Sequence, residues 1–181
     1  LMAALPALRK LLKNAGAPLF PDPLISVGLP SKGALAAKRR RIGECWTEKS
    51  SEGEKRCAIF LSPTLSKPVQ MLDVLVHELI HASVGVKEGH GKPFKRVADR
   101  LGLIGPMRGT HAGPELEVTL TDLAKSLGKF PHEALKGFKS PVKVQTTRMR
   151  LYVCEVCGRK IRCASDTLSA RHQCDDGEEG D

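Results

Sequence analysis

Apolar residues between Met71 and Ala82 recur around most of a helical circumference rather than along a single stripe. The apolar positions include Leu72, Leu75, Val76, Leu79 and Ile80. A helix that is apolar on nearly every side is buried, so this stretch is predicted to be a core helix that begins after Pro68. His77, Glu78 and His81 interrupt the pattern, and polar groups are costly to bury without partners.

Shorter apolar runs bounded by turn residues predict an α+β chain. Strands are expected at Leu24–Val27, Ile42–Trp46, Cys57–Ser62 and Lys160–Ala164. Helices are expected at Pro93–Leu101, Pro114–Leu127 and Pro131–Lys136, with a Gly-rich loop at Gly105–Gly113. Residues 1–16 carry Leu5, Leu8, Leu11 and Leu12 at helical spacing, and this segment is predicted to be an amphipathic helix. Charged residues interrupt its apolar run, so it does not have the pattern of a signal peptide.

The interruption in the core helix has the form His-Glu-x-x-His, from His77 to His81. Residues four apart lie on one helical face, so both imidazoles can reach one metal ion. Glu78 is then placed to take a proton from a metal-bound water, as in zinc hydrolases. The alternative is a chance match, but a metal would offset the cost of burying these polar groups.

Catalytic zinc usually has three protein ligands and an open position, and His90 is the candidate for the third ligand. It lies between Gly89 and Gly91, which allow a tight turn back over the helix. The alternative is that His90 is an exposed loop residue. No fourth protein ligand is evident near the helix, which favours an open, catalytic site.

The C-terminal segment predicts a second, structural zinc site. Cys154 and Cys157 are spaced as a zinc knuckle, and a second pair of ligands is expected about 15 residues later. His172 and Cys174 lie at that spacing. Cys163 competes with His172 for the fourth position, although it falls within an expected strand. The remaining alternative is a ribbon that binds no metal.

The motif His-Glu-Leu-Ile-His-Ala, followed by Gly-His-Gly-Lys-Pro-Phe, resembles the SprT-like zinc metalloprotease family, which includes the DNA–protein crosslink protease Spartan. Ile59–Pro63 and the Cys154-x-x-Cys157 pair also look like that family, especially its bacterial and phage members. The resemblance runs from about Gly43 to the end of the chain. It implies that His77, His81 and His90 bind the catalytic zinc and that Glu78 is the catalytic acid and base.

These features predict four segments. They are an N-terminal amphipathic helix (1–16), a zincin-like metalloprotease domain (17–138), a linker (139–150, with Lys139–Val144 at its start) and a zinc-ribbon-like segment with an acidic tail (151–181). In a zincin-like domain, a small sheet packs on the metal-bearing helix. The sheet edge beside that helix can hold an extended chain by strand addition, so an unfolded or flexible polypeptide is the expected substrate.

The chain is basic, with a net charge of +9 and a sequence pI near 9.4. That balance favours polyanionic partners, and Lys38–Arg41 is a candidate phosphate-binding run. Aromatic residues are few, so nonspecific binding to DNA phosphates is expected rather than base stacking. Six cysteines in 181 residues are not dense, which fits a reducing compartment. We therefore expect a cytoplasmic monomer, associated with nucleoid or phage DNA, that has no membrane segment.

Two main functional interpretations follow, and a zinc amidase or another small-substrate hydrolase is a weaker third. The first is a zinc-dependent endopeptidase that cleaves proteins at or near DNA, with Glu78 activating the water. The alternative is a nucleic-acid-binding zinc-ribbon protein whose metal site is not proteolytic. Glu78 favours the first, because a structural zinc site has no need of a carboxylate there and fills its fourth position with protein.

Overall fold

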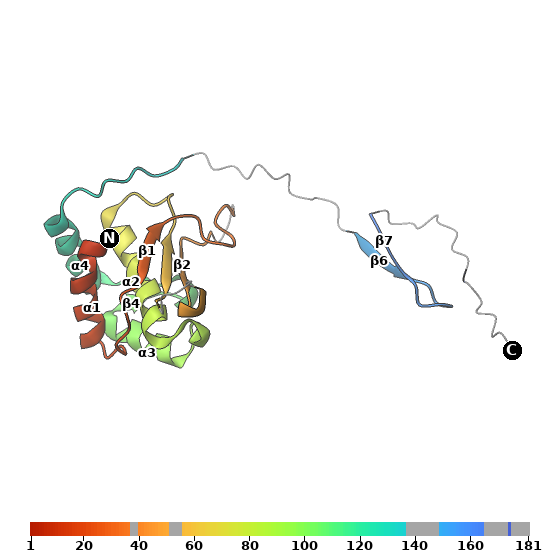
Figure 1. Cartoon of the computed structure of the whole chain (residues 1–181), viewed down its shortest axis with the longest axis horizontal. Helices are drawn as coiled ribbons and strands as arrows, with labels where there is room; N and C mark the ends of the chain where they lie inside the picture. The colour runs from red at the N-terminus through yellow and green to blue at the C-terminus, as the bar shows by residue number, and fades with distance from the viewer. Residues whose placement is uncertain (37–39, 51–55, 137–148, 165–173, 175–181) are drawn as a thin grey trace. The chain divides into compact units, whose positions relative to one another are not determined.

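The computed structural model describes residues 1–36, 40–50, 56–136, 149–164 and 174. The chain divides into two compact units, Leu1–Lys139 and Ser140–Asp181 (Figure 1). Helices and short strands both contribute to it, so the fold is of the α+β kind that the patterns predict. The expected linker and acidic tail fall almost entirely outside the described residues.

A three-stranded sheet forms one layer of the larger unit. Its strands are β1 (Leu24–Val27), β2 (Gly43–Trp46) and β3 (Ala58–Leu61), arranged in the order β1-β3-β2. β1 runs parallel to β3, whereas β2 runs antiparallel to it, with Cys45 opposite Ile59. All three predicted strands are confirmed, and β2 is an edge strand of this sheet.

The predicted core helix is α2 (Pro68–Val84), which packs against β2 and β3. Leu75, Leu79 and Ile80 are fully buried, and on β3 Ile59 and Leu61 are equally buried. Proline occupies the first turn of α2, where its missing N–H group costs no intrahelical bond. The helix ends at Gly85, whose φ of 97° is a conformation that favours glycine.

Three further α-helices in the described part of the chain contribute to the same core as α2. A 3₁₀ turn η1 (Met2–Ala4) leads into α1 (Leu5–Asn14), and Leu5, Leu8 and Leu12 of α1 belong to the same buried core as α2. The predicted helices at Pro93–Leu101 and Pro114–Leu127 are confirmed as α3 (Lys92–Leu101) and α4 (Pro114–Leu127). Both of them contact α2. Short 3₁₀ turns η2 (Glu48–Ser50) and η3 (Val86–Glu88) occupy connections.

The expected helix at Pro131–Lys136 is wrong, since these residues have no regular secondary structure. The backbone N–H of Leu135 donates instead to the carbonyl oxygen of Pro63, at 2.9 Å. His132 Nε2 lies 3.1 Å from the same oxygen. This segment therefore satisfies its polar groups against the loop that follows β3 rather than within a helical turn.

The expected loop at Gly105–Gly113 also has more structure than predicted. It contains the 3₁₀ turn η4 (Met107–Gly109) and the strand β5 (His111–Ala112), which pairs antiparallel with β4 (Leu103–Ile104). Strands of two residues are too short for alternating burial to appear in a sequence. This β4–β5 hairpin connects α3 to α4.

The smaller unit contains a two-stranded antiparallel hairpin, β6 (Arg150–Val153) and β7 (Lys160–Cys163). The predicted strand at Lys160–Ala164 is thereby confirmed. The turn is closed by the N–H of Cys154, which donates to Arg159 O at 2.9 Å. Gly158 has a φ of 68° at this turn, and its N–H donates to Cys154 O.

Candidate metal centre and active site

Two histidines of α2 and one from the following turn bring their imidazoles together. His77 and His81 lie on one face of the helix, and the chain reverses through Gly85 and Gly89, which have φ values of 97° and 52°. His90 Nε2 then lies 3.1 Å from His77 Nε2 and 3.2 Å from His81 Nε2. The structure thus places all three predicted histidines within reach of a single ion.

The spacing of the three nitrogens fits zinc. A tetrahedral zinc ion about 2.05 Å from each nitrogen separates its ligands by about 3.3 Å, close to the two measured distances of 3.1 and 3.2 Å. Within the described residues, no fourth His, Cys, Asp or Glu joins this group. The set therefore has the three protein ligands and the open position of a catalytic zinc site.

Phe94 forms an apolar support beneath the three imidazoles. Its side chain is fully buried, and its ring centroid lies 4.9, 4.6 and 4.9 Å from those of His77, His81 and His90. It lies in the first turn of α3, four residues after His90. Phe94 cannot be recognised as a site residue from the sequence, because a phenylalanine at the start of a helix is common in any protein core.

Burial makes the imidazoles neutral. It lowers the pKa of His77 to about 4, with a smaller contribution from His90, and it lowers the pKa of His81 to about 3, with contributions from the other two histidines. The pKa of His90 is also lowered, by burial and by the charge of Arg108. A metal must displace any proton on its ligand, so neutral imidazoles are ready to bind near neutral pH.

The two helix histidines differ in what their second nitrogen meets. His77 Nδ1 lies 2.8 Å from Thr110 Oγ1, between η4 and β5. His81 Nδ1 is buried and, in the described part of the chain, has no hydrogen-bond partner. Sequence reasoning missed Thr110, since it lies 33 residues from His77 in a stretch expected to be an irregular loop.

Glu78 is buried beneath the edge strand of the sheet. Only 6% of its surface is exposed, and it is not part of the histidine group found among the described residues. Burial, with a smaller contribution from the charge of Glu44, raises the pKa of Glu78 to about 8 against the partly opposing charge of the Arg41 guanidinium. A carboxyl group with a pKa in this range can both accept and release a proton near neutral pH.

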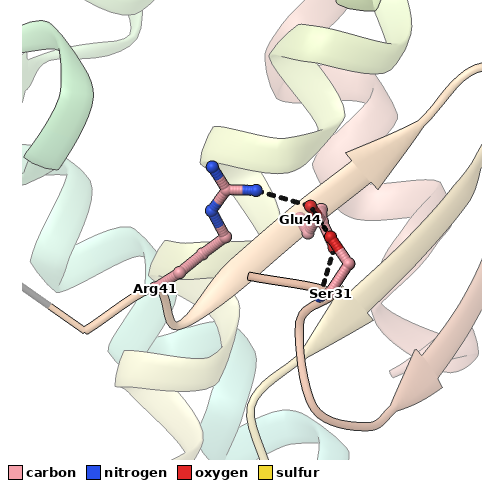
Figure 2. A network of polar contacts seen from close by, with 3 residues as sticks. All are labelled: Ser31, Arg41 and Glu44. Atoms are coloured by element: carbon pink, nitrogen blue, oxygen red, sulfur yellow. Dashed lines mark hydrogen bonds and ion pairs between the residues drawn. The ribbon is translucent and has the colours of Figure 1, made fainter. Parts of the chain in front are cut away.

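A polar network of Glu44 on β2 with Arg41 and Ser31 outside that strand supplies those two charges (Figure 2). Glu44 accepts hydrogen bonds from the Ser31 backbone N–H at 2.7 Å and the Ser31 hydroxyl at 2.8 Å, and its Oε1 lies 2.5 Å from Arg41 Nη1. Burial alone would raise the pKa of Glu44, but bonds from Ser31, Trp46 and Arg41 outweigh it and lower the pKa overall. Glu44 is therefore a fixed negative charge, and Arg41 is ion-paired rather than a free member of a basic run.

The smaller unit brings together three of the five C-terminal metal candidates. Cys154, Cys157 and Cys174 offer sulfur atoms within 4.8 Å of one another, and the Cys154 and Cys174 sulfurs are 3.7 Å apart. Tetrahedral zinc at about 2.3 Å from sulfur separates its thiolates by about 3.8 Å, so the cluster fits that ion. Cys163 is not in the group formed by the described residues, and His172 lies outside them.

Hydrogen bonding favours one thiolate in this cluster. Backbone N–H groups of Cys157 and Val156 and the neighbouring thiols lower the pKa of Cys154 to about 7. The thiol of Cys174 bonds to Cys154 and Cys157, which raises the pKa of Cys174 to about 11. The cluster thus shares protons that a metal ion would displace.

No helix within the described ranges is long and apolar enough to cross a membrane.

Comparison with curated proteins and with solved structures gives no significant match. The model of the SprT-like family matches residues 21–121. That range begins before β1 and includes His77, Glu78, His81, His90 and Thr110, but it stops short of the thiol cluster. The match spans more than half of the chain, and the chain belongs to the SprT-like family.

Proposed function

We propose that this protein is a zinc-dependent endopeptidase in which His77, His81 and His90 hold the metal and Glu78 is the general base. The observation that carries the proposal is the convergence of three neutral imidazoles, with nitrogens 3.1 and 3.2 Å apart. Glu78, which follows His77 on the same helix, is buried under the edge strand at Gly43. Family membership supports the same reaction class, because the SprT-like family is one of metallopeptidases.

The zinc ion, Glu78 and the surrounding core have separate roles in the proposed reaction. Zinc held by the three imidazoles supplies the Lewis acidity that makes water a nucleophile at neutral pH. Glu78 accepts the proton of the attacking water and passes it to the leaving nitrogen of the cleaved peptide bond. Phe94 and the surrounding core keep bulk water from the back of the imidazoles, and this strengthens electrostatic interactions within the site.

The edge strand accounts for a polypeptide substrate. Among the described residues, β2 pairs with β3 alone, and it passes directly over Glu78 at Gly43. An extended chain that adds to the free edge of β2 gains backbone hydrogen bonds and brings its peptide carbonyls near the carboxyl group. Segments whose backbone groups are already paired within a folded protein are not available for this addition, so unfolded or flexible chains are the proposed substrates.

The alternative is a metal site without proteolysis in a nucleic-acid-binding protein. Structural zinc sites are closed by a fourth protein ligand, and the described residues provide none beside the histidines. The carboxyl group of Glu78 also serves no ligand role in that group. Both observations favour the catalytic proposal.

DNA is the proposed location of the reaction. The net charge is +9, and the β6–β7 hairpin carries exposed Arg150, Arg159, Lys160 and Arg162. Cationic side chains on such a surface bind DNA phosphates independently of base sequence, and the release of counterions drives this binding. A protease held on DNA in this way would meet proteins bound to or crosslinked with it. The thiol cluster that follows β6 is proposed to hold a second, structural zinc that orders this hairpin.

Cleavage of one polypeptide in its folded and unfolded forms tests the proposal. The full-length, zinc-loaded chain should cut the unfolded form at internal bonds, as mass spectrometry of the products would show, and leave the folded form intact. A chelator should stop cleavage, and added zinc should restore it. A zinc-loaded chain that cuts no unfolded polypeptide, with or without DNA, would rule out the endopeptidase proposal.

A further inference from the structure

The β4–β5 hairpin places the hydroxyl group of Thr110 beside His77, one of the proposed metal ligands. Thr110 Oγ1 lies 2.8 Å from His77 Nδ1, and the opposite nitrogen of the same ring, Nε2, faces His90. Thr110 is half-buried, and it precedes β5 directly. The contact joins α2 to a segment that contributes none of the three ligands.

We propose that Thr110 is a positioning residue for the metal site, because its hydroxyl oxygen accepts the Nδ1–H of His77. This inference rests on the proposed zinc site. An imidazole has one proton and one lone pair on its two ring nitrogens when neutral. An acceptor at Nδ1 therefore holds the proton there and leaves the lone pair on Nε2, the atom that points at the other two imidazoles.

The hairpin is built to hold Thr110 in place. The N–H of Gly113 donates to Gly102 O at 2.8 Å, which closes the base of the hairpin, and Ile104 pairs with His111 next to Thr110. A Cβ on Gly113 would stand 2.6 Å from Gly102 O, so this closure requires glycine. Gly102 is also the end of α3, at a φ of 81°. The element that carries Phe94 thus continues directly into the one that carries Thr110.

The two histidines of α2 are consequently not equivalent. His77 has a partner that fixes its tautomer and ring orientation, whereas the buried Nδ1 of His81 has none within the described residues. Partners of this kind are worth about 10- to 100-fold in metal affinity. His77 is therefore the ligand whose orientation depends on a residue outside the His-Glu-x-x-His motif.

A second role for Thr110 must be separated from this one, because its methyl group could simply pack the hairpin. Thr110→Val keeps the shape of the side chain but removes the acceptor. Thr110→Ser keeps the hydroxyl but removes the methyl group. Thr119→Val is the matched control, since the Thr119 hydroxyl donates to Glu115 O on the exposed surface of α4.

The experiment measures metal affinity in the full-length chain. The protein is first loaded with cobalt(II), and zinc is then titrated into it. The loss of visible absorption from cobalt(II) at the imidazole site measures zinc binding there, while sulfur-to-cobalt charge-transfer bands measure binding at the thiol cluster separately. Melting temperatures of the metal-free proteins show whether folding is intact. We expect Thr110→Val to weaken zinc binding by about 10-fold or more, with Thr110→Ser and Thr119→Val close to the parent chain.

The outcomes distinguish this inference from the proposed function. Equal zinc affinity in Thr110→Val and the parent chain would overturn it, as would a Thr110→Ser variant as weak as Thr110→Val. If the parent chain bound no metal at the imidazole site, the proposed function and this inference would both be overturned. A parent chain that binds zinc, with a loss confined to Thr110→Val, supports the positioning role whether or not peptide cleavage is detected.

Discussion

Gly43 leaves the space that the side chain of Glu78 occupies. A Cβ built on Gly43 would stand 2.5 Å from Glu78 Oε1 and 2.6 Å from Val74 Cγ1. Both distances are too short for any real side chain at this position. The edge strand β2 can therefore lie directly over the His-Glu-x-x-His helix only because residue 43 is glycine, and that approach brings the edge to the proposed general base.

Gly43→Ala should displace Glu78 and lower peptidase activity while zinc remains bound. The three atoms nearest to a Cβ at position 43 belong to Glu78 and Val74 rather than to a histidine, so the metal content should stay unchanged. A displacement of about 1 Å at a catalytic group can cost on the order of 100-fold in rate, and we expect a loss of that size in kcat/KM. Gly28→Ala is the control, because its Cβ would stand 3.3 Å from the Phe60 ring at the other edge of the sheet. Full activity in Gly43→Ala would contradict the role assigned to this contact.

The buried carboxyl group should make the metal-free protein sensitive to alkali. The pKa of Glu78 is raised from 4.5 to about 8 by burial, so the folded chain holds a proton that the unfolded chain releases. The stability due to the neutral carboxyl group is complete below about pH 4.5 and is lost as the pH rises through about 8. Glutamine does not titrate. The melting temperature of metal-free Glu78→Gln, minus that of the parent chain, should therefore increase from about pH 5.5 to about pH 8.5.

Histidine titration does not confuse that comparison. The pKa values of His77 and His81 are lowered to about 4 and 3, so both histidines destabilise the fold as the pH falls below about 6.5. The same residues are present in the parent chain and in Glu78→Gln, and their effect cancels in the difference. A melting-temperature difference that is constant with pH would show that Glu78 is not held protonated.

The thiol cluster should bind a second zinc that peptide cleavage does not need. Cys154→Ser removes the thiol whose pKa is lowered to about 7, the best thiolate of the group. Zinc content should fall from about two ions per chain to about one, while cleavage of a short, uncharged peptide stays unchanged. Cys163→Ser is the control, because Cys163 lies outside the group formed by the described residues. Unchanged zinc content in Cys154→Ser would remove the second site.

The β6–β7 hairpin should account for part of the DNA affinity. Lys160 and Arg162 are exposed and lie opposite Val153 and Leu151, on one face of the hairpin. Replacing both with glutamine should weaken binding to DNA of any sequence and reduce the slope of log affinity against log salt by about 2. A salt titration of both proteins measures this, with Lys10→Gln together with Lys13→Gln as a charge-matched control. Identical slopes for the hairpin variant and the parent chain would show that Lys160 and Arg162 do not contribute to DNA binding.

The sequence predicts the parts of this site that depend on local spacing. The apolar positions around α2 indicate a buried helix, and two histidines four residues apart must share its face. Glycines on either side of His90 indicate the turn that returns the third histidine to the helix. The strands β1 and β3 can also be predicted from the sequence, because each is a mostly apolar run bounded by turn residues.

Tertiary contacts explain what the sequence does not show. The hydroxyl of Thr110 meets His77 across 33 residues, through a hairpin whose strands have only two residues each. Arg41 belongs to a basic run in the sequence, but Glu44 pairs with it once β2 is formed. Pro131 stands where a helix could begin, but the backbone N–H of Leu135 donates to the carbonyl oxygen of Pro63 instead. These contacts form only when the chain folds, so no local sequence pattern predicts them.

Glu78→Gln, assayed next to the parent chain for both zinc content and cleavage of an unfolded polypeptide, tests the central claim most directly. Glutamine has nearly the same shape as glutamate but cannot accept the proton of the attacking water. The account predicts that the variant keeps zinc at the imidazole site, as measured by metal analysis, and loses about 100- to 10,000-fold in cleavage rate. A zinc-loaded Glu78→Gln protein that cleaves the polypeptide as fast as the parent chain would contradict it.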